Sequence, residues 1–158
     1  MKIIKTNILN PVSSSQAEYL KDVFLTIKND KISSISKKPE TSDFNDHSDC
    51  VCIPGLIDTH VHISQYFIRG SHSSNLLHWL NTYAFPEELK SQNHEYARKV
   101  AQDFFKDSIR KGTTTSVIYT APFKQACEVA FQIAPHQMKS DKYLVLFSKY
   151  FSFYLNSI

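Results

Sequence analysis

One stretch decides the fold of this chain: Pro54-Gly55-Leu56-Ile57-Asp58-Thr59-His60-Val61-His62. Residues 50–57 predict a buried β-strand that is entered through the Pro-Gly break. Because side chains on a strand alternate between its two faces, His60 and His62 point the same way and their imidazoles converge. Imidazole is a good ligand for zinc and iron, and a catalytic zinc takes about three protein ligands plus water. The pair therefore predicts part of a metal site.

The spacing of the two histidines is weak evidence by itself. The chain has 7 histidines among 158 residues, and most histidines are surface residues or hydrogen-bonded core residues. Asp58 precedes the pair at the carboxyl end of the predicted strand, where barrel enzymes place their catalytic groups. We expect Asp58 either to orient a ligand histidine or to cap the following loop.

The composition is that of an ordinary globular protein, with 42% hydrophobic and 21% charged residues. The net charge is only +3, and no run of Lys and Arg predicts a nucleic-acid partner. An odd count of 3 cysteines suits a reducing compartment. The amino terminus lacks a signal-peptide pattern, and no apolar run of ~18 residues predicts a membrane span. We therefore expect a cytoplasmic protein without membrane or nucleic-acid partners.

The amino-terminal part predicts β structure. Residues 2–9 and 23–28 are expected strands, Asn29-Asp30 a turn, and residues 32–35 the returning strand of a hairpin. Residues 37–49 are polar and aperiodic, which predicts a loop.

After the histidine pair, strands and helices are expected to alternate. Residues 64–74 predict a loop, and residues 76–83 a short helix that stops near Pro86. The longest helix has Asn93 as its cap and Gly112 as its terminator, and its apolar face consists of Ala97, Val100, Ala101, Phe104, Phe105 and Ile109.

A second strand at residues 113–119 and a helix at residues 124–134 follow. This β, α, β, α order is typical of the start of a parallel α/β barrel. Since a complete (β/α)8 barrel takes ~200 to 400 residues, we expect 158 residues to form only part of one. Residues 135–158 are unusually rich in aromatic residues, and we expect a divergent tail there; the alternative is a further strand or helix that covers the sheet edge.

The stretch from Pro54 to His62 is similar to the first-strand signature of the metal-dependent amidohydrolase superfamily. Within it the chain resembles the guanine deaminases from about Ile53 to Thr120, in four blocks: Ser64-Gln65-Tyr66, Gly70-Ser71, Leu77-His78-Trp79-Leu80, and Tyr83-Ala84-Phe85-Pro86-Glu87-Glu88. The resemblance implies an α/β fold: a partial (β/α)8 metal-dependent hydrolase barrel, comprising its first two βα units, preceded by part of a small β domain. The implied domains are residues 1–50, 51–134 and the tail 135–158.

The resemblance also implies a chemistry. A single zinc ion held by His60, His62 and later ligands activates the water that converts guanine to xanthine and ammonia. His62 and Gln65 are implied to bind the substrate, although Gln65 could also be an exposed loop residue. The later ligands and the proton-shuttling glutamate of the family have no match here, so no catalytic residue is expected in this chain; His60 and His62 are expected as metal ligands. The family resemblance makes a homodimer the expected state of a complete enzyme.

Other polar and aromatic residues are expected to be structural. Arg69 is expected to pack in a loop and Trp79 to lie in the core rather than to stack on a base. Four further histidines are not expected to bind metal: His47, His72, His78 and His94.

Two functions of different class follow from these expectations. One is an aminohydrolase of guanine-deaminase type, of which this chain is the first part. The other is a catalytically inactive chain, unstable or bound to a full-length subunit, because two ligands make a weak and open zinc site. Another deaminase of the same superfamily is a third alternative.

Overall fold

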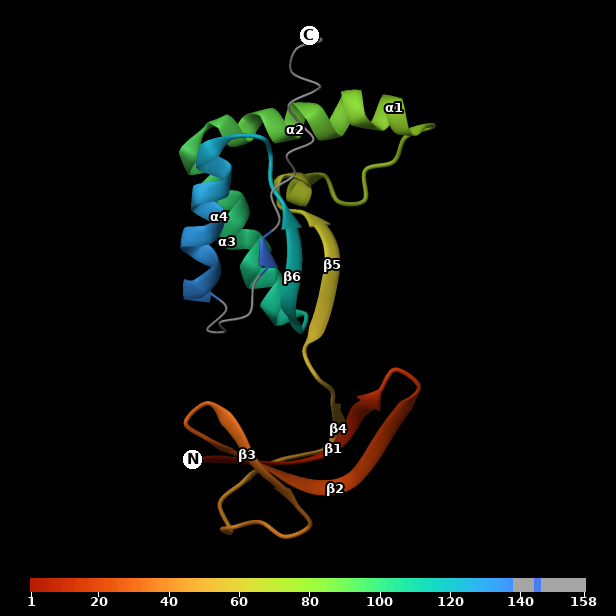
Figure 1. The fold of residues 1–158 in the computed structure, drawn as a ribbon, viewed down its shortest axis with the longest axis vertical. Helices are drawn as coiled ribbons and strands as arrows, with labels where there is room; N and C mark the ends of the chain where they lie inside the picture. The colour runs from red at the N-terminus through yellow and green to blue at the C-terminus, as the bar shows by residue number, and fades with distance from the viewer. Residues whose placement is uncertain (138–143, 146–158) are drawn as a thin grey trace. The chain divides into compact units, whose positions relative to one another are not determined.

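The computed structural model describes residues 1–137 and 144–145 and divides into two compact units, Met1–Pro54 and Gly55 onward. The class is mixed α/β, as the sequence predicts (Figure 1). No helix in the described part of the chain combines the length and the apolar character that a membrane span requires.

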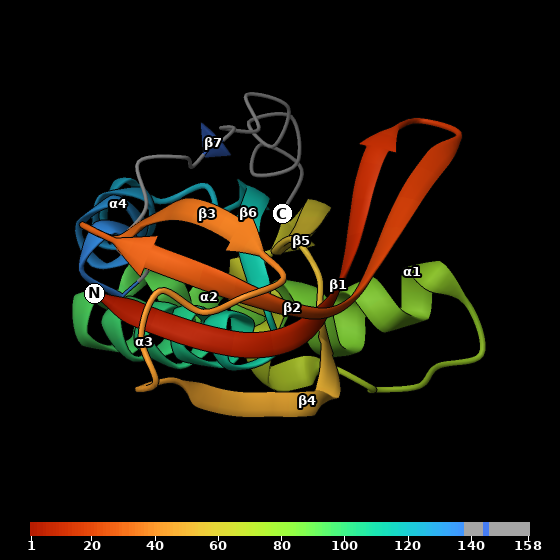
Figure 2. The same cartoon turned by 90° about the horizontal axis from the view of Figure 1, so that it is seen from below.

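The first unit is a four-stranded sheet with the order β3-β2-β1-β4 (Figure 2). Its strands are β1 (Lys2–Ser13), β2 (Gln16–Lys28), β3 (Lys31–Ser36) and β4 (Asn45–Cys52). β2 pairs antiparallel with β1 and β3, whereas β4 pairs parallel with β1. Asn29 and Asp30 both have positive φ, 51° and 59°, as a two-residue hairpin turn of type I′ requires. The predicted hairpin is confirmed.

The loop predicted at residues 37–49 is wrong in its second half, because β4 begins at Asn45. Most side chains of this edge strand are exposed, so it carries no apolar alternation for a sequence pattern to detect. Hydrogen bonds hold it instead: the Asn7 side-chain amide donates to the carbonyl oxygens of Ser48 at 2.9 Å and Cys50 at 3.0 Å.

The second unit contains β5 (Leu56–His62) and β6 (Thr113–Tyr119), which pair in parallel. The two-residue β7 (Leu144–Val145) pairs parallel with β6, so the sheet order is β5-β6-β7. Of the predicted tail 135–158, residues 135–137 belong to the end of α4, and residues 138–143 and 146–158 lie outside the described part of the chain.

The single buried strand predicted at residues 50–57 is wrong. β4 ends at Cys52, β5 begins at Leu56, and residues 53–55 separate them. Leu56 and Ile57 are 48% and 67% exposed, because no described element covers their side chains.

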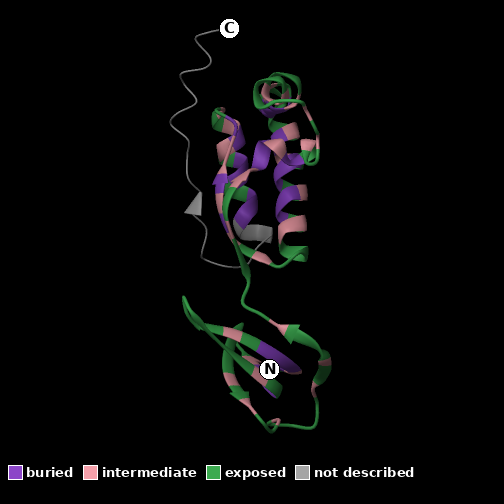
Figure 3. Ribbon diagram, turned by 90° about the vertical axis from the view of Figure 1, so that its right-hand side faces the viewer, coloured by how far each residue is buried: buried purple, intermediate pink, exposed green. Residues whose placement is uncertain are grey.

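Two helices, α3 (His94–Arg110) and α4 (Lys124–Gln137), lie against β6 and form the main core (Figures 1 and 3). Phe105, Ile118 and Val129 of this core are fully buried. The Asn93 side chain caps α3 by accepting from the Tyr96 backbone N–H at 3.0 Å, and Gly112 ends the turn after α3 with φ of +87°. Both predicted helices and the predicted cap are confirmed, but Ile109 is 38% exposed and lies outside the core.

A helical run connects β5 to α3. It consists of η1 (Ile63–Ile68), α1 (Leu76–Trp79), η2 (Leu80–Ala84), α2 (Phe85–Leu89) and η3 (Lys90–Gln92). The loop prediction is therefore wrong for η1, a 3₁₀ helix. The stop predicted near Pro86 is also wrong, because η2 is a wider π turn, in which the Phe85 backbone N–H donates to the Leu80 carbonyl oxygen. This wider turn accommodates the proline ring at the start of α2.

Candidate metal and substrate site

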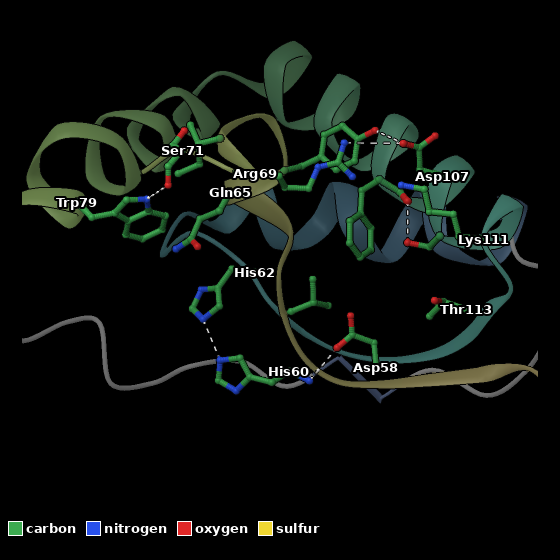
Figure 4. Close-up of a pocket in the computed structure, with 16 residues that line it drawn as sticks. Asp58, His60, His62, Gln65, Arg69, Ser71, Trp79, Asp107, Lys111 and Thr113 are labelled. Carbon is green, nitrogen blue, oxygen red and sulfur yellow. Dashed lines mark hydrogen bonds and ion pairs between the residues drawn. The ribbon is translucent and has the colours of Figure 1, made fainter. Parts of the chain in front are cut away.

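The imidazoles of His60 and His62 meet at the carboxyl end of β5 (Figure 4). Their Nε2 atoms are 3.1 Å apart. The Asp58 carboxylate accepts a hydrogen bond from the His60 backbone N–H at 3.1 Å, within the strand that carries the pair. From the sequence we expect Asp58 either to orient a ligand histidine or to cap the following loop. Its described hydrogen bond is to a backbone N–H and not to an imidazole.

Tyr119 stacks on both histidines. Its ring centroid lies 4.4 Å from that of His60 and 5.1 Å from that of His62, with interplanar angles of 30° and 16°. Tyr119 ends β6 and is the register partner of His62. Sequence reasoning missed this residue, although the parallel alignment of two strand ends is a signal that could have found it.

The histidine pair fits two positions of a tetrahedral zinc ion. With Zn–N bonds of 2.0–2.1 Å, two ligating nitrogens would be about 3.3 to 3.4 Å apart, close to the observed separation. Burial, together with the nearby His60, holds the pKa of His62 below its usual value. This favours the neutral imidazole, which is the form that binds metal. Residues 1–137 and 144–145 contain no cluster of three or more His, Cys, Asp or Glu that could hold a metal.

Glu88 of α2 is a second residue that sequence reasoning missed. It is 5% exposed, and its Oε1 accepts from Gln65 Nε2 at 2.9 Å and from Ser64 Oγ at 3.3 Å. The same oxygen lies 4.0 Å from His62 Nδ1. Burial raises the pKa of Glu88, while the two hydrogen bonds oppose that shift. The block of residues 83–88 that resembles the guanine deaminases contains Glu88, but no local pattern gives it a role, because its partners lie 23 and 24 residues earlier in the chain.

A pocket of about 450 Å³ opens beside the pair, with His60, His62, Gln65 and Trp79 among its lining residues. Gln65 therefore lines a pocket and is not a freely exposed loop residue. Trp79 belongs to neither core cluster, so its predicted core position is wrong. Its indole N–H instead donates to the Ser71 carbonyl oxygen at 3.1 Å (Figure 4), which leaves the ring at the pocket wall.

The other side of the pocket is formed by Arg69, Tyr66 and Asp107. The Arg69 guanidinium lies 3.8 Å from the centre of the Tyr66 ring and 3.8 Å from the Asp107 carboxylate. The Tyr66 hydroxyl donates to Asp107 at 2.7 Å, and this hydrogen bond lowers the pKa of Asp107. Arg69 thus contacts η1 and α3 and lines the pocket, so the expectation that it packs only in a loop is wrong.

The remaining histidines take other partners where contacts are described. His78 Nδ1 is 2.6 Å from Ser73 Oγ, and His94 Nδ1 is 3.5 Å from Glu95. His47 lies in the first unit, on β4, and His72 is exposed.

The family model of the amidohydrolase family matches residues 51–137, more than half of the 158 residues. The chain belongs to the amidohydrolase family. Among amidohydrolase relatives, it is 30% identical over 141 residues to guanine deaminase of Escherichia coli, an alignment covering 84% of this chain and 32% of that protein. It is also 37% identical over 87 residues to a 5′-deoxyadenosine deaminase of Methanocaldococcus jannaschii, covering 54% and 20%.

Solved amidohydrolase structures agree with this relationship. The guanine deaminase of C. acetobutylicum with bound guanine in the active site superimposes with a TM-score of 0.72 at 34% identity, over 84% of this chain and 33% of that one. The E. coli guanine deaminase superimposes with a TM-score of 0.75 at 27% identity, over 86% and 35%. The chain thus spans about a third of the length of the relatives it matches.

Proposed function

We propose that this chain is the first part of a zinc-dependent aminohydrolase that converts guanine and water to xanthine and ammonia. The observation that carries the proposal is the convergence of His60 and His62 Nε2, 3.1 Å apart, in a pocket that Gln65 also lines. The similarity to guanine deaminases, one of them solved with guanine in its active site, supports guanine as the substrate.

In the proposed reaction, His60 and His62 would hold the zinc ion. Bound zinc would lower the pKa of a water molecule so that it can attack the substrate near neutral pH. The water oxygen would bond to the purine carbon that carries the exocyclic amine, and the C–N bond would break; the amine takes one proton of the water and leaves as ammonia, and the other proton ends on a ring nitrogen of xanthine. Gln65 orients the base, and together with His62 it forms the proposed substrate contact.

We further propose that β5, α3, β6 and α4 form the first two βα units of a (β/α)8 barrel, in a domain of residues 51–134. Residues 1–50 would form part of a small β domain, and residues 135–158 a divergent tail. The parallel pairing of β5 with β6 and the family match from residue 51 support this division. A cytoplasmic location and a homodimeric complete enzyme remain part of the proposal; 3 cysteines, an odd count, suit a reducing compartment.

The 158-residue chain by itself is proposed to be inactive, because two histidines supply fewer ligands than a catalytic zinc requires. A chain that binds a full-length subunit is the second proposed state. The alternative to guanine is a different substrate of a deaminase in the same superfamily. The similarity to 5′-deoxyadenosine deaminase supports this alternative.

Zinc binding to the 158-residue chain tests the ligand assignment. In competition with a chromophoric chelator, we expect one zinc per chain for the unaltered protein and for His94→Ala, and a loss of binding for His60→Ala and for His62→Ala. Equal binding by all four proteins would contradict the assignment. Guanine should not be consumed above the level of His60→Ala, and xanthine formation above that level would contradict the inactive state.

A further inference from the structure

Glu88 is a buried acid whose described side-chain hydrogen bonds come from Ser64 and Gln65, on the segment that follows His62. We propose that Glu88 is a positioning residue that fixes the side-chain amide of Gln65. In this orientation the Gln65 carbonyl oxygen faces the pocket. A bound base must therefore offer an N–H donor to that oxygen. The inference rests on the proposed function for the identity of the base. The orientation of the amide can be tested without a substrate.

The direction of the hydrogen bond fixes the orientation of the amide. An ionised carboxylate only accepts hydrogen bonds, and Glu88 Oε1 accepts from Gln65 Nε2 at 2.9 Å. The nitrogen and oxygen of an amide lie on opposite arms of one planar group, so the oxygen turns away from Glu88. Gln65 is among the residues that line the pocket, and Glu88 is not. The carbonyl oxygen is therefore the acceptor that Gln65 offers to a ligand.

Burial makes this orientation costly to reverse. Glu88 is 5% exposed, and a buried carboxylate that loses a donor retains an uncompensated desolvation cost. A flipped amide would also place the Gln65 carbonyl oxygen against the carboxylate, which repels it. Ser64 Oγ donates to the same oxygen at 3.3 Å, and this second donor helps to hold the carboxylate in place.

The same contact constrains the choice of substrate. Guanine has a protonated ring nitrogen, N1, next to its 2-amino group, so this edge presents N–H donors. Adenine has an unprotonated N1, which is an acceptor. A carbonyl oxygen that cannot exchange places with an amide N–H attracts the guanine edge and repels the N1 lone pair of adenine. Glu88 would therefore contribute to specificity without contact with the base.

The chain offers a matched control at the preceding position. Glu87 is also a buried glutamate of α2, 4% exposed, but its carboxylate contacts Lys90 at 2.7 Å and the Tyr96 hydroxyl. Glu87→Gln therefore removes the same charge from the same helix without removing a partner of Gln65.

The first experiment measures hydrogen exchange of the Gln65 side-chain amide by NMR in the 158-residue chain, with Gln65→Ala to assign the signals. In the unaltered protein and in Glu87→Gln, we expect exchange about tenfold slower than for Gln16, which is exposed. In Glu88→Gln, which can accept or donate, this protection should be lost. Unchanged protection in Glu88→Gln overturns the proposal. If Glu88→Gln does not fold, the unaltered protein alone tests the proposal. Exchange of the Gln65 amide as fast as that of Gln16 would then overturn the proposal.

The second experiment compares the dissociation constants of guanine and adenine with the zinc-loaded chain. We expect the preference for guanine to fall about tenfold in Glu88→Gln and to be unchanged in Glu87→Gln. An unchanged preference in Glu88→Gln overturns the specificity role. A chain that binds neither base contradicts the base-binding role in the proposed function, while amide exchange still decides whether Glu88 holds Gln65.

Discussion

β5 and β6 are neighbouring parallel strands of the same length, 7 residues each, yet their environments differ. Ile118 of β6 is 0% exposed in the core formed with α3 and α4, whereas Ile57 of β5 is 67% exposed. β5 is held mainly by backbone pairing to β6. The comparison shows that the strand carrying the histidine pair contributes little to the described core and that the adjacent strand supports it.

The largest expected effect is the difference in the free energy of unfolding between an alanine substitution at Ile118 and one at Ile57. Ile118→Ala should lower the free energy of unfolding by about 2 to 5 kcal/mol, because it leaves a cavity in a packed core. Ile57→Ala should change it by less than about 0.5 kcal/mol, as an exposed substitution does. Urea denaturation of both variants measures the difference. A comparable cost for Ile57→Ala would mean that β5 is covered in solution and would remove the contrast between the strands.

A smaller effect is expected at Gly55, which precedes β5 and lies against Thr114 of β6. A Cβ atom at Gly55 would overlap Thr114 Oγ1 and would lie 2.7 Å from Thr114 Cβ, and side-chain rotation cannot relieve the second contact. Gly55→Ala should therefore cost about 1 to 3 kcal/mol of stability through overpacking.

A double-mutant cycle with Thr114→Gly checks this cause by denaturation. In that background the cost of Gly55→Ala should shrink, because the three nearest atoms are gone. If Gly55→Ala costs the same stability in the unaltered protein and in Thr114→Gly, contact with Thr114 is not the cause. The start of β5 would then not depend on close contact with β6.

The same contrast explains which features the sequence could predict. The long helix α3 was predictable because its buried residues recur on one face between Asn93 and Gly112. The convergence of His60 and His62 was predictable because strand geometry alone places residues i and i+2 on one face. Both are local patterns that need no knowledge of what packs against them.

Features that depend on a distant partner were not predictable from such patterns. β4 is mostly exposed and is recognised only through its pairing with β1. In the sequence Glu88 is an ordinary acidic residue of a helix, and only the fold shows that η1 brings Gln65 within hydrogen-bond distance of it. Tyr119 reads as a strand aromatic until the register of β5 and β6 sets it beside both imidazoles.

Tyr119 links the buried strand to the histidine pair and should give the smallest effect. Aromatic pairs contribute about 0.5 to 1.5 kcal/mol beyond burial. Tyr119→Ala should therefore raise the dissociation constant for zinc several-fold, and by about tenfold at most. Tyr119→Phe keeps the stacked ring and should bind zinc like the unaltered protein. Chelator competition measures all three affinities. Equal weakening by both substitutions would assign the effect to the hydroxyl group, whereas no weakening by either would show that β5 orders its two histidines without support from β6.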